Sequence, residues 1–295
     1  MTACVRRITL ACVCLFISAA PLFAGERQRF ASSPERPFPV AYAERIFAAA
    51  IEGAASVEAA AYHATGLVLP HHLLAADLIA EGFAIVRKGR YSRIVILSPD
   101  HFNRGRTPFS VPGRDFLVSR GTVRLDRDGA EALMRNELVS KSNLFSHEHG
   151  VQALLPFIAH HFPAVPVLPV AIGRDSSSGE WRSLAASLLP LTDSGTLIVQ
   201  STDFSHYLDR EETARKDAES LAVLLSGDPE RVLLLRQPAN IDSRGALFIQ
   251  MSLQKAIGSV PVIMSRSSSF EYDLREAEKS GGTSYITAVF SNGVP

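Results

Sequence analysis

The chain has 295 residues, of which 30 are lysine or arginine and 30 are aspartate or glutamate, so its formal net charge at pH 7 is zero. This balance lacks the excess of positive charge that domains binding nucleic acid or anionic membranes carry, and we expect neither partner. All three cysteines, Cys4, Cys12 and Cys14, lie near the N-terminus. Without that segment the chain has no disulfide and no thiolate metal site, so binding is expected in a pocket that takes a small molecule.

The N-terminus has the order of a secretory signal peptide. Arg6 and Arg7 precede an apolar stretch from Ile8 to Ala20, and the segment Pro21-Leu22-Phe23-Ala24-Gly25 that follows offers a small residue at a cleavage point. We expect cleavage after Ala24, so that residues 1–24 are the signal peptide and the mature protein is periplasmic or secreted. An uncleaved membrane anchor is the alternative, but the apolar stretch is shorter than the roughly 20 residues that span a bilayer. No membrane association is expected after cleavage.

The rest of the chain has the pattern of one α/β domain. Residues 25–39 are polar, charged and proline-bearing, and are expected to form an extended lead-in. Residues 40–295, about 255 residues without a repeat or linker, fit one large domain. Short apolar runs predict strands at 66–69, 93–97, 165–172, 196–201, 260–265 and 284–290.

Amphipathic patterns between these strands predict helices at 42–60, 73–87, 126–138, 151–161, 179–189, 210–225, 229–235 and 243–257. The alternation of strands and helices indicates a single domain with a central mostly parallel or mixed sheet flanked by helices. In open sheets of this kind, ligands bind beyond the carboxyl ends of the strands.

Three potential metal ligands lie at the ends of short, apolar, strand-like runs. His71 follows the first predicted strand, His101 follows the second, and Asp242 directly precedes the last predicted helix. Two imidazoles and one carboxylate would make a facial triad, which binds Fe(II) and leaves positions open for substrate and dioxygen. The sequence therefore predicts a metal centre built from His71, His101 and Asp242.

Each of these residues has a structural alternative. His71 could open the helix that follows, and its neighbour His72 could be the ligand instead. His101 could be a plain loop residue after a turn-forming Ser-Pro-Asp sequence. Aspartate is a preferred helix N-cap, so a cap and a metal ligand are equally open interpretations of Asp242.

A carboxylate and an imidazole also lie close together in the sequence, at Asp203 and His206. A carboxylate near an imidazole can fix its tautomer, as a general acid or base requires. We therefore interpret His206 as a catalytic proton carrier and Asp203 as its partner. Asp203 could instead cap the helix that begins near Asp209.

The local sequence pattern indicates the roles of two further groups of histidines. If His147, Glu148 and His149 form an extended segment, both imidazoles point to one side and Glu148 points to the other. Only His149 is then assigned to the pocket, with the catalytic residues. His160 and His161 end an amphipathic helix, where imidazoles favour the terminal carbonyl groups, and a structural role is expected.

Six short motifs appear in an order that is typical of one family. They are Pro70-His71, Ser98-Pro99-Asp100-His101, Glu148-His149-Gly150-Val151-Gln152, Pro166-Val167-Leu168-Pro169-Val170, Ser201-Thr202-Asp203-Phe204-Ser205-His206 and Asn240-Ile241-Asp242-Ser243-Arg244-Gly245. In these motifs the chain resembles the Memo family, whose bacterial members are called AmmeMemoRadiSam system protein B. That family is similar in fold to class III extradiol dioxygenases, which have a central sheet, flanking helices and a metal pocket at one end.

The resemblance implies a metalloprotein, a non-haem iron dioxygenase-like oxidoreductase that acts on a small organic substrate, and the predicted signal peptide implies that it is exported. The resemblance makes His71 and His101 metal ligands and His206 the acid or base. The Memo pattern has a cysteine where this chain has Asp242, and a carboxylate oxygen favours hard metals. Fe(II) is the expected metal, with Mn, Cu or Zn as alternatives. Partners from an AmmeMemoRadiSam system are implied by the same resemblance.

Two other functions would use the same pocket. A non-catalytic protein would bind a ligand or peptide there without turnover, and a metal-dependent hydrolase would use metal-bound water and consume no oxygen. Strand-end placement and the family resemblance both predict that His71, His101, His149 and His206 converge at one end of the sheet.

Overall fold

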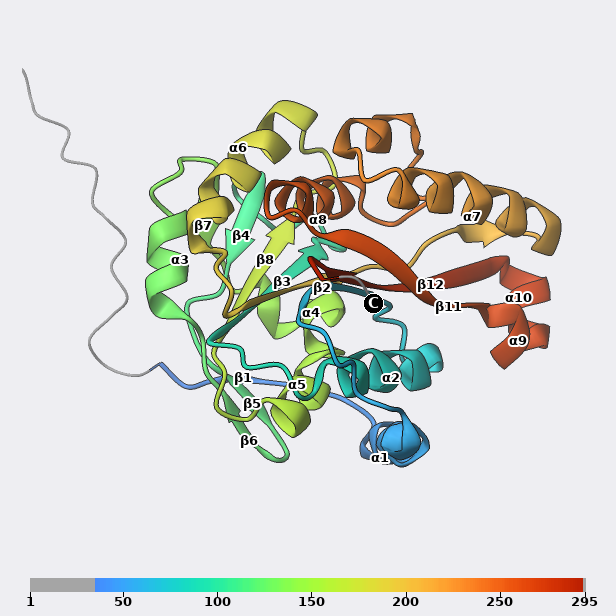
Figure 1. Ribbon diagram of the computed structural model, residues 1–295, viewed down its shortest axis with the longest axis horizontal. Helices are drawn as coiled ribbons and strands as arrows, with labels where there is room; N and C mark the ends of the chain where they lie inside the picture. Colours follow the sequence, from blue (N-terminus) through green and yellow to red (C-terminus); the bar gives the residue numbers. More distant parts are fainter. Residues whose placement is uncertain (1–34, 294–295) are drawn as a thin grey trace, which may run out of the picture.

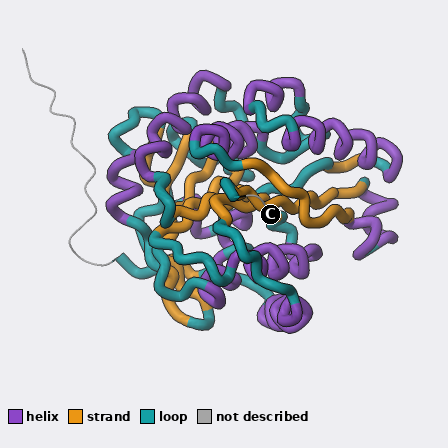
Figure 2. Tube along the Cα trace, viewed as in Figure 1, coloured by secondary structure: helices purple, strands orange, loops and turns teal. Residues whose placement is uncertain are grey.

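The computed structural model describes residues 35–293, so the predicted signal peptide and most of the predicted lead-in lie outside the described residues. A mixed sheet runs through the middle of the molecule, and helices cover both of its faces (Figures 1 and 2). Within residues 35–293, no helix is both long enough and apolar enough to cross a membrane.

The main sheet has nine strands in the order β10-β12-β2-β9-β3-β8-β4-β7, with β11 paired to β12. They are β2 (Ala64–Leu69), β3 (Arg93–Pro99), β4 (Phe109–Val111), β7 (Val139–Lys141), β8 (Val167–Ile172), β9 (Thr196–Ser201), β10 (His206–Leu208), β11 (Val260–Ser268) and β12 (Gly282–Ser291). The central strands β2, β9, β3 and β8 are parallel, whereas β12 is antiparallel to β2. The predicted mixed α/β fold is thus confirmed.

A smaller sheet of three strands lies beside the main one. Its strands are β1 (Phe38–Pro39), β5 (Phe116–Val118) and β6 (Gly121–Val123). Because β1 pairs in parallel with β5, the end of the predicted lead-in is part of the folded domain.

Ten α-helices and five short 3₁₀ turns connect the strands within the described residues. The helices are α1 (Glu44–Gly53), α2 (Ala76–Val86), α3 (Arg127–Leu133), α4 (His149–Gln152), α5 (Leu155–His161), α6 (Ser178–Leu188), α7 (Arg210–Leu225), α8 (Arg244–Ala256), α9 (Ser269–Tyr272) and α10 (Leu274–Ser280). The turns are η1 (Ala54–Ser56), η2 (Leu73–Ala75), η3 (Leu144–Ser146), η4 (Leu189–Leu191) and η5 (Pro229–Leu234).

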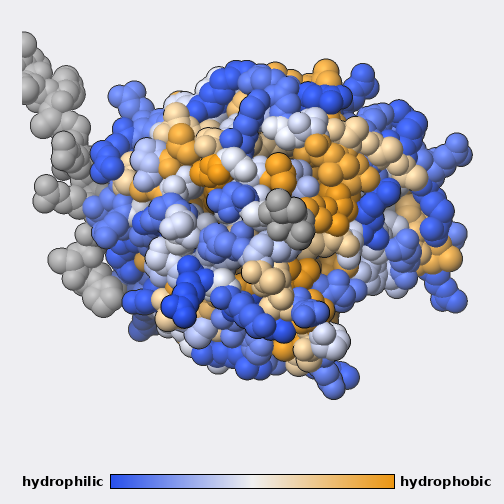
Figure 3. All heavy atoms as spheres, viewed as in Figure 1, coloured by the Kyte–Doolittle hydropathy of each residue, from blue (hydrophilic) through white to orange (hydrophobic). Residues whose placement is uncertain are grey.

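The sheet separates two hydrophobic cores. Side chains alternate along a strand, so Leu67 and Leu69 of β2 pack with α1, α2 and α5 on one face, and Val68 packs with α6 and α8 on the other. A strand that is buried on both faces has a continuous run of apolar residues, and for this reason the central strands could be predicted from the sequence. On the outer surface, hydrophilic side chains cover most of the face drawn in Figure 3, with hydrophobic areas between them.

His161 ends α5, as expected, and its half-buried ring packs against the core. Its ring stacks on Phe83 with the centroids 6.5 Å apart, and its Nε2 atom is buried without a hydrogen-bond partner in the described part of the chain. Burial, with the charges of His160 and Arg87, lowers the pKa of His161 to about 4.

We therefore expect stability to depend on His161 in mildly acidic solution. The unfolded chain protonates this imidazole near pH 6.5, whereas the folded chain resists protonation down to about pH 4. The unfolded state binds more protons between these values, so stability should fall as the pH is lowered through this window. Urea unfolding of His161→Phe should show a shallower pH slope than the wild type. His147→Gln, which changes an exposed histidine, is the control and should keep the wild-type slope. If His161→Phe also kept the wild-type slope, the prediction would be contradicted.

Candidate metal centre

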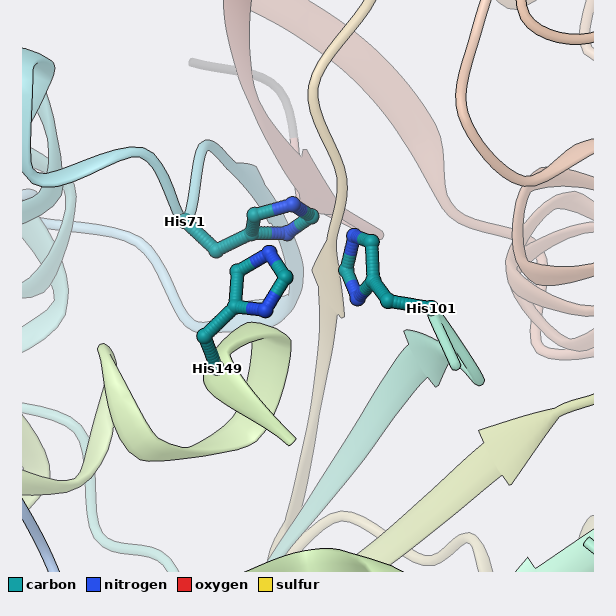
Figure 4. Close-up of side chains that lie close together, drawn as sticks. All are labelled: His71, His101 and His149. Carbon is teal, nitrogen blue, oxygen red and sulfur yellow. The ribbon is translucent and has the colours of Figure 1, made fainter. Parts of the chain in front are cut away.

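Three histidines from separate parts of the chain converge beyond the carboxyl ends of the parallel strands (Figure 4). His71 follows β2, His101 follows β3, and His149 is the first residue of α4. One ring nitrogen of each lies within 4.8 Å of those of the other two. The sequence placed His149 in the pocket wall, and the geometry makes it a third imidazole that could bind the same metal ion.

His71 is held so that its Nε2 atom is free to bind. The Ser201 hydroxyl donates to the Gly150 carbonyl, so the hydroxyl oxygen is left to accept from Nδ1 of His71, which is 3.2 Å away. The proton of the neutral ring then sits on Nδ1. Burial lowers the pKa of His71 to about 3, which keeps the imidazole neutral and its Nε2 lone pair available, as metal binding requires.

His101 is oriented by Glu148, a residue to which the sequence analysis assigned no role. Oε1 of the fully buried Glu148 carboxylate lies 2.5 Å from Nδ1 of His101. The same carboxylate accepts the backbone N–H groups of His101, at 3.0 Å, and Gly150, at 2.9 Å. Burial alone would lower the pKa of His101, but the hydrogen bond and charge of Glu148 raise it overall. A carboxylate on Nδ1 leaves Nε2 for a metal, an arrangement typical of metal-binding histidines.

The expected extended geometry at His147 to His149 is wrong. His147 is the C-cap residue of η3, and Glu148 is the N-cap residue of α4, with its side chain accepting from the N–H of Gly150. Glu148 therefore points inward because it caps a helix. An acidic residue directly before a helical pattern was the signal available in the sequence.

Asp242 faces the histidines, and the N-cap interpretation of it is wrong. Its Oδ2 atom lies 3.2 Å from Nε2 of His71 and 3.9 Å from Nε2 of His101. The carboxylate accepts hydrogen bonds from the Thr202 hydroxyl and, at 3.0 Å, from the N–H of Asp203. Burial, and then the charge of Asp203, raise the pKa of Asp242 to about 7.

Ser243 caps α8 in place of Asp242. The Ser243 hydroxyl accepts a hydrogen bond from the N–H of Ala246 at 3.2 Å. The carboxylate of Asp242 is thereby free of the helix and remains a candidate third ligand beside His71 and His101.

Asp203 contacts His71 and caps no helix. Its Oδ1 atom accepts from the His71 N–H at 3.1 Å, and Oδ2 lies 3.7 Å from Nε2 of His71. Asp209 is the residue that caps α7. Burial alone would raise the pKa of Asp203, but the charges of His71 and His206 lower it overall. Asp203 therefore supports the site as a carboxylate.

His206 lies beside the three converging histidines and is not one of them. Its Nδ1 atom is 3.2 Å from the Thr283 hydroxyl, and its Nε2 atom is buried with no hydrogen-bond partner in residues 35–293. Burial lowers the pKa of His206, although the charge of Asp203 opposes this. Nε2 therefore has no partner for a proton within the described part of the protein, and the acid or base role of His206 stays a prediction.

A glycine sets the position of β10, which carries His206. Gly281 has φ +81°, and a Cβ atom there would lie 2.5 Å from the carbonyl carbon of Tyr207. Tyr207 itself has φ 60°, a conformation that is costly for a residue with a side chain. The close approach of two backbones at this point therefore requires glycine.

We expect Gly281→Ala to lower the free energy of unfolding by about 3 kcal/mol, because it adds both backbone strain and a collision with Tyr207. Gly227→Ala is the matched control, since Gly227 has φ +65° but no atom within 4 Å of an added Cβ. It should lower stability by only about 1 kcal/mol. Equal losses in urea unfolding would show that the contact with Tyr207 is unimportant.

The family model described as Memo-like protein matches residues 44–289. The chain belongs to the Memo family. It is similar to a MEMO1 family protein of Thermotoga sp. strain RQ2, with 31% identity over 180 residues, which are 59% of this chain and 65% of that relative. A MEMO1 family protein of Methanosarcina acetivorans is 24% identical over 214 residues, covering 70% of this chain and 77% of the relative.

The chain thus spans just under two thirds of the length of the Thermotoga Memo protein. Among solved structures, it is similar to an uncharacterized protein, JW3007, from Escherichia coli K12, with a TM-score of 0.47 and 12% identity over 76% of this chain and 98% of the other. Family membership confirms the resemblance found in the sequence motifs.

The donor atoms of this Memo protein suit a divalent metal ion. His71, His101 and His149 each offer a ring nitrogen, and Asp242 adds a carboxylate oxygen close to Nε2 of His71. Nitrogen and oxygen donors of this kind favour hard or borderline divalent ions over soft ions such as Cu(I). The three imidazoles could therefore bind such an ion.

Proposed function

We propose that this Memo protein is a non-haem iron enzyme that oxidises a small organic molecule. The observation that supports it is the approach of Asp242 Oδ2 to the Nε2 atoms of His71, at 3.2 Å, and His101, at 3.9 Å. Two imidazoles and one carboxylate on one side of a metal are typical of Fe(II) oxygenases. Bound iron would supply the binding and activation of dioxygen.

The residues of the chain would divide the remaining work. Ser201 and Glu148 orient His71 and His101 with their Nε2 atoms toward the centre. The unpartnered Nε2 atom of His206 would take a proton from a substrate oxygen or return one. His149 has a half-exposed side chain, which leaves it at the mouth of the site.

An aromatic and a cationic side chain near the mouth support a flat, anionic substrate. Phe102 is 48% exposed, and its ring centroid lies 5.9 Å from that of His149. The guanidinium carbon of Arg104 lies 5.2 Å from the centre of the Phe102 ring. A planar molecule with a phenolate or carboxylate group would find both a ring to pack against and a positive charge there.

The test begins with anaerobically purified protein reconstituted with Fe(II). We expect one tightly bound iron per chain and oxygen uptake when catechols or other small phenols are added. His101→Ala should lose both. Tight binding of a phenol without oxygen uptake would indicate a binding protein, hydrolysis without oxygen uptake would indicate a metal hydrolase, and either result would overturn the oxidation proposed here.

A further inference from the structure

A fourth histidine, His72, is paired with a buried tyrosine beside the candidate metal centre. Tyr285 lies on β12 and is fully buried, and its hydroxyl oxygen is 2.7 Å from Nδ1 of His72. The two rings meet edge to face, with centroids 5.9 Å apart. His72 itself is exposed, so the tyrosine fixes one edge of a ring whose other edge is accessible.

Tyr285 is held rigidly. It packs with Ala75 and Leu78 in a small apolar cluster, and the ring of Tyr272 meets it edge to face at 6.0 Å. The Tyr272 hydroxyl in turn lies 2.9 Å from both carboxylate oxygens of Asp77. The phenol oxygen therefore has a fixed position, and it constrains the imidazole that it bonds.

The direction of this hydrogen bond follows from burial. In the described part of the chain, the Tyr285 hydroxyl has a single hydrogen-bond partner, Nδ1 of His72. If Nδ1 were the donor, the phenol proton would be buried without an acceptor, which costs about 1 to 3 kcal/mol. Burial also raises the pKa of Tyr285 far above its usual range, so the phenol keeps its proton. Tyr285 therefore donates, and the proton of neutral His72 sits on Nε2.

A protonated Nε2 cannot be a metal ligand, but it can donate a hydrogen bond. Thr283 lies two residues before Tyr285 on β12 and contacts His206, whereas Tyr285 contacts His72. Side chains two residues apart on a strand lie on the same face, so His72 lies on the same side of β12 as His206, and its charge affects the pKa of His149, Asp203 and His206. The exposed His72 ring thus has an Nε2–H group beside the candidate site, with no acceptor for it within residues 35–293. The alternative that His72 replaces His71 as a ligand is disfavoured for the same reason.

We propose that His72 is a substrate-binding residue, which donates from Nε2 to an anionic oxygen, phenolate or carboxylate, of a molecule bound at His71, His101 and His149. Tyr285 is its positioning residue, because it fixes the tautomer of the ring. This inference deepens the proposed function and rests on it for the identity of the bound molecule, whereas the tautomer of His72 is independent of any metal.

The tautomer is tested first, on metal-free protein. In ¹⁵N-histidine NMR spectra near pH 8.5, where an ordinary imidazole is neutral, the signals lost in His72→Gln identify His72. We expect the Nε2–H form in the wild type and a mixture of both forms in Tyr285→Phe. A wild-type ring with its proton on Nδ1 would overturn the proposal whatever the metal content.

Binding is tested with 4-nitrocatechol and zinc-loaded protein, because zinc is redox-inert and permits no turnover. His72→Ala should raise the dissociation constant about 10-fold, the loss expected for one hydrogen bond to a charged oxygen. Tyr285→Phe should raise it less, and both should keep the wild-type zinc content. Tyr91→Phe is the matched control, since Tyr91 is also buried but bonds the Ala64 carbonyl at 3.0 Å.

An unchanged dissociation constant in His72→Ala would overturn the assignment. So would zinc-loaded wild-type protein that does not bind the catechol. If the wild type takes up no zinc, this would instead contradict the proposed function. The NMR measurement would then still decide which ring nitrogen of His72 carries the proton.

Discussion

Replacing Asp242 with asparagine is expected to weaken metal binding by at least about 100-fold and to leave the stability of the metal-free protein almost unchanged. The carboxylate faces Nε2 of His71 at 3.2 Å, and an amide is a far poorer ligand. Asparagine can nevertheless satisfy the same neighbours: its oxygen would accept from the Asp203 N–H, and its amide N–H would donate to the Thr202 hydroxyl. Metal titration and thermal melting measure the two effects separately.

Ser243→Ala should show the opposite pattern. It removes the side chain that caps α8, which lowers stability by about 1 kcal/mol, or roughly 2 to 4 °C in melting temperature. Its metal affinity should equal that of the wild type. If Asp242→Asn also binds metal with wild-type affinity, Asp242 is not a ligand and the facial triad is wrong.

The second large effect is expected at Glu148. Glu148→Ala should lower the free energy of unfolding by about 3 kcal/mol, because three N–H donors, two of the partly buried His101 and one of the buried Gly150, lose their acceptor. It should also weaken metal binding by about 10-fold to 100-fold, since the His101 ring loses the group that orients it. Urea unfolding and metal titration would measure these losses.

Glu180→Ala is a suitable control for Glu148→Ala. Glu180 also accepts a backbone N–H at the start of a helix, that of Ser177 in the capping box of α6. It is only half-buried, and within residues 35–293 it has no hydrogen bond or ion pair to the converging histidines. Its loss should lower stability by less than about 1 kcal/mol and leave metal affinity unchanged. Unchanged metal affinity in Glu148→Ala as well would mean that His101 needs no such support.

The longest and most buried elements were the ones that the sequence predicted well. The predicted strand 196–201 is β9, and the predicted helix 210–225 is α7, with the same bounds. The predicted helix 151–161 is instead two pieces, α4 and α5, and Pro156 in the first turn of α5 explains why no single helix forms. The predicted helix 229–235 is the 3₁₀ turn η5.

Strands of three residues could not be predicted. β10, for example, carries His206 but is too short to show a period of two in its side chains. Its existence depends on pairing with β12, more than 70 residues away. Local sequence contains no trace of such a pairing.

The candidate site was partly predictable, for physical reasons that differ between residues. The rule that ligands gather at strand ends placed His71 and His101 together. Asp242 and Ser243 are equally good N-cap residues by type, so only the backbone geometry at Ser243 could decide between them. Glu148 was missed because its role depends on where a helix of four residues begins.

The segment from Glu148 to Gly150 contacts every ring of the candidate centre. Glu148 orients His101, His149 is itself one of the converging imidazoles, and the Gly150 carbonyl accepts from Ser201, which orients His71. The glycine is needed for this approach, since a Cβ atom there would lie 2.3 Å from the Ser98 hydroxyl oxygen. The three imidazoles are thus not independent, and the centre should assemble or come apart cooperatively as this one segment docks or leaves.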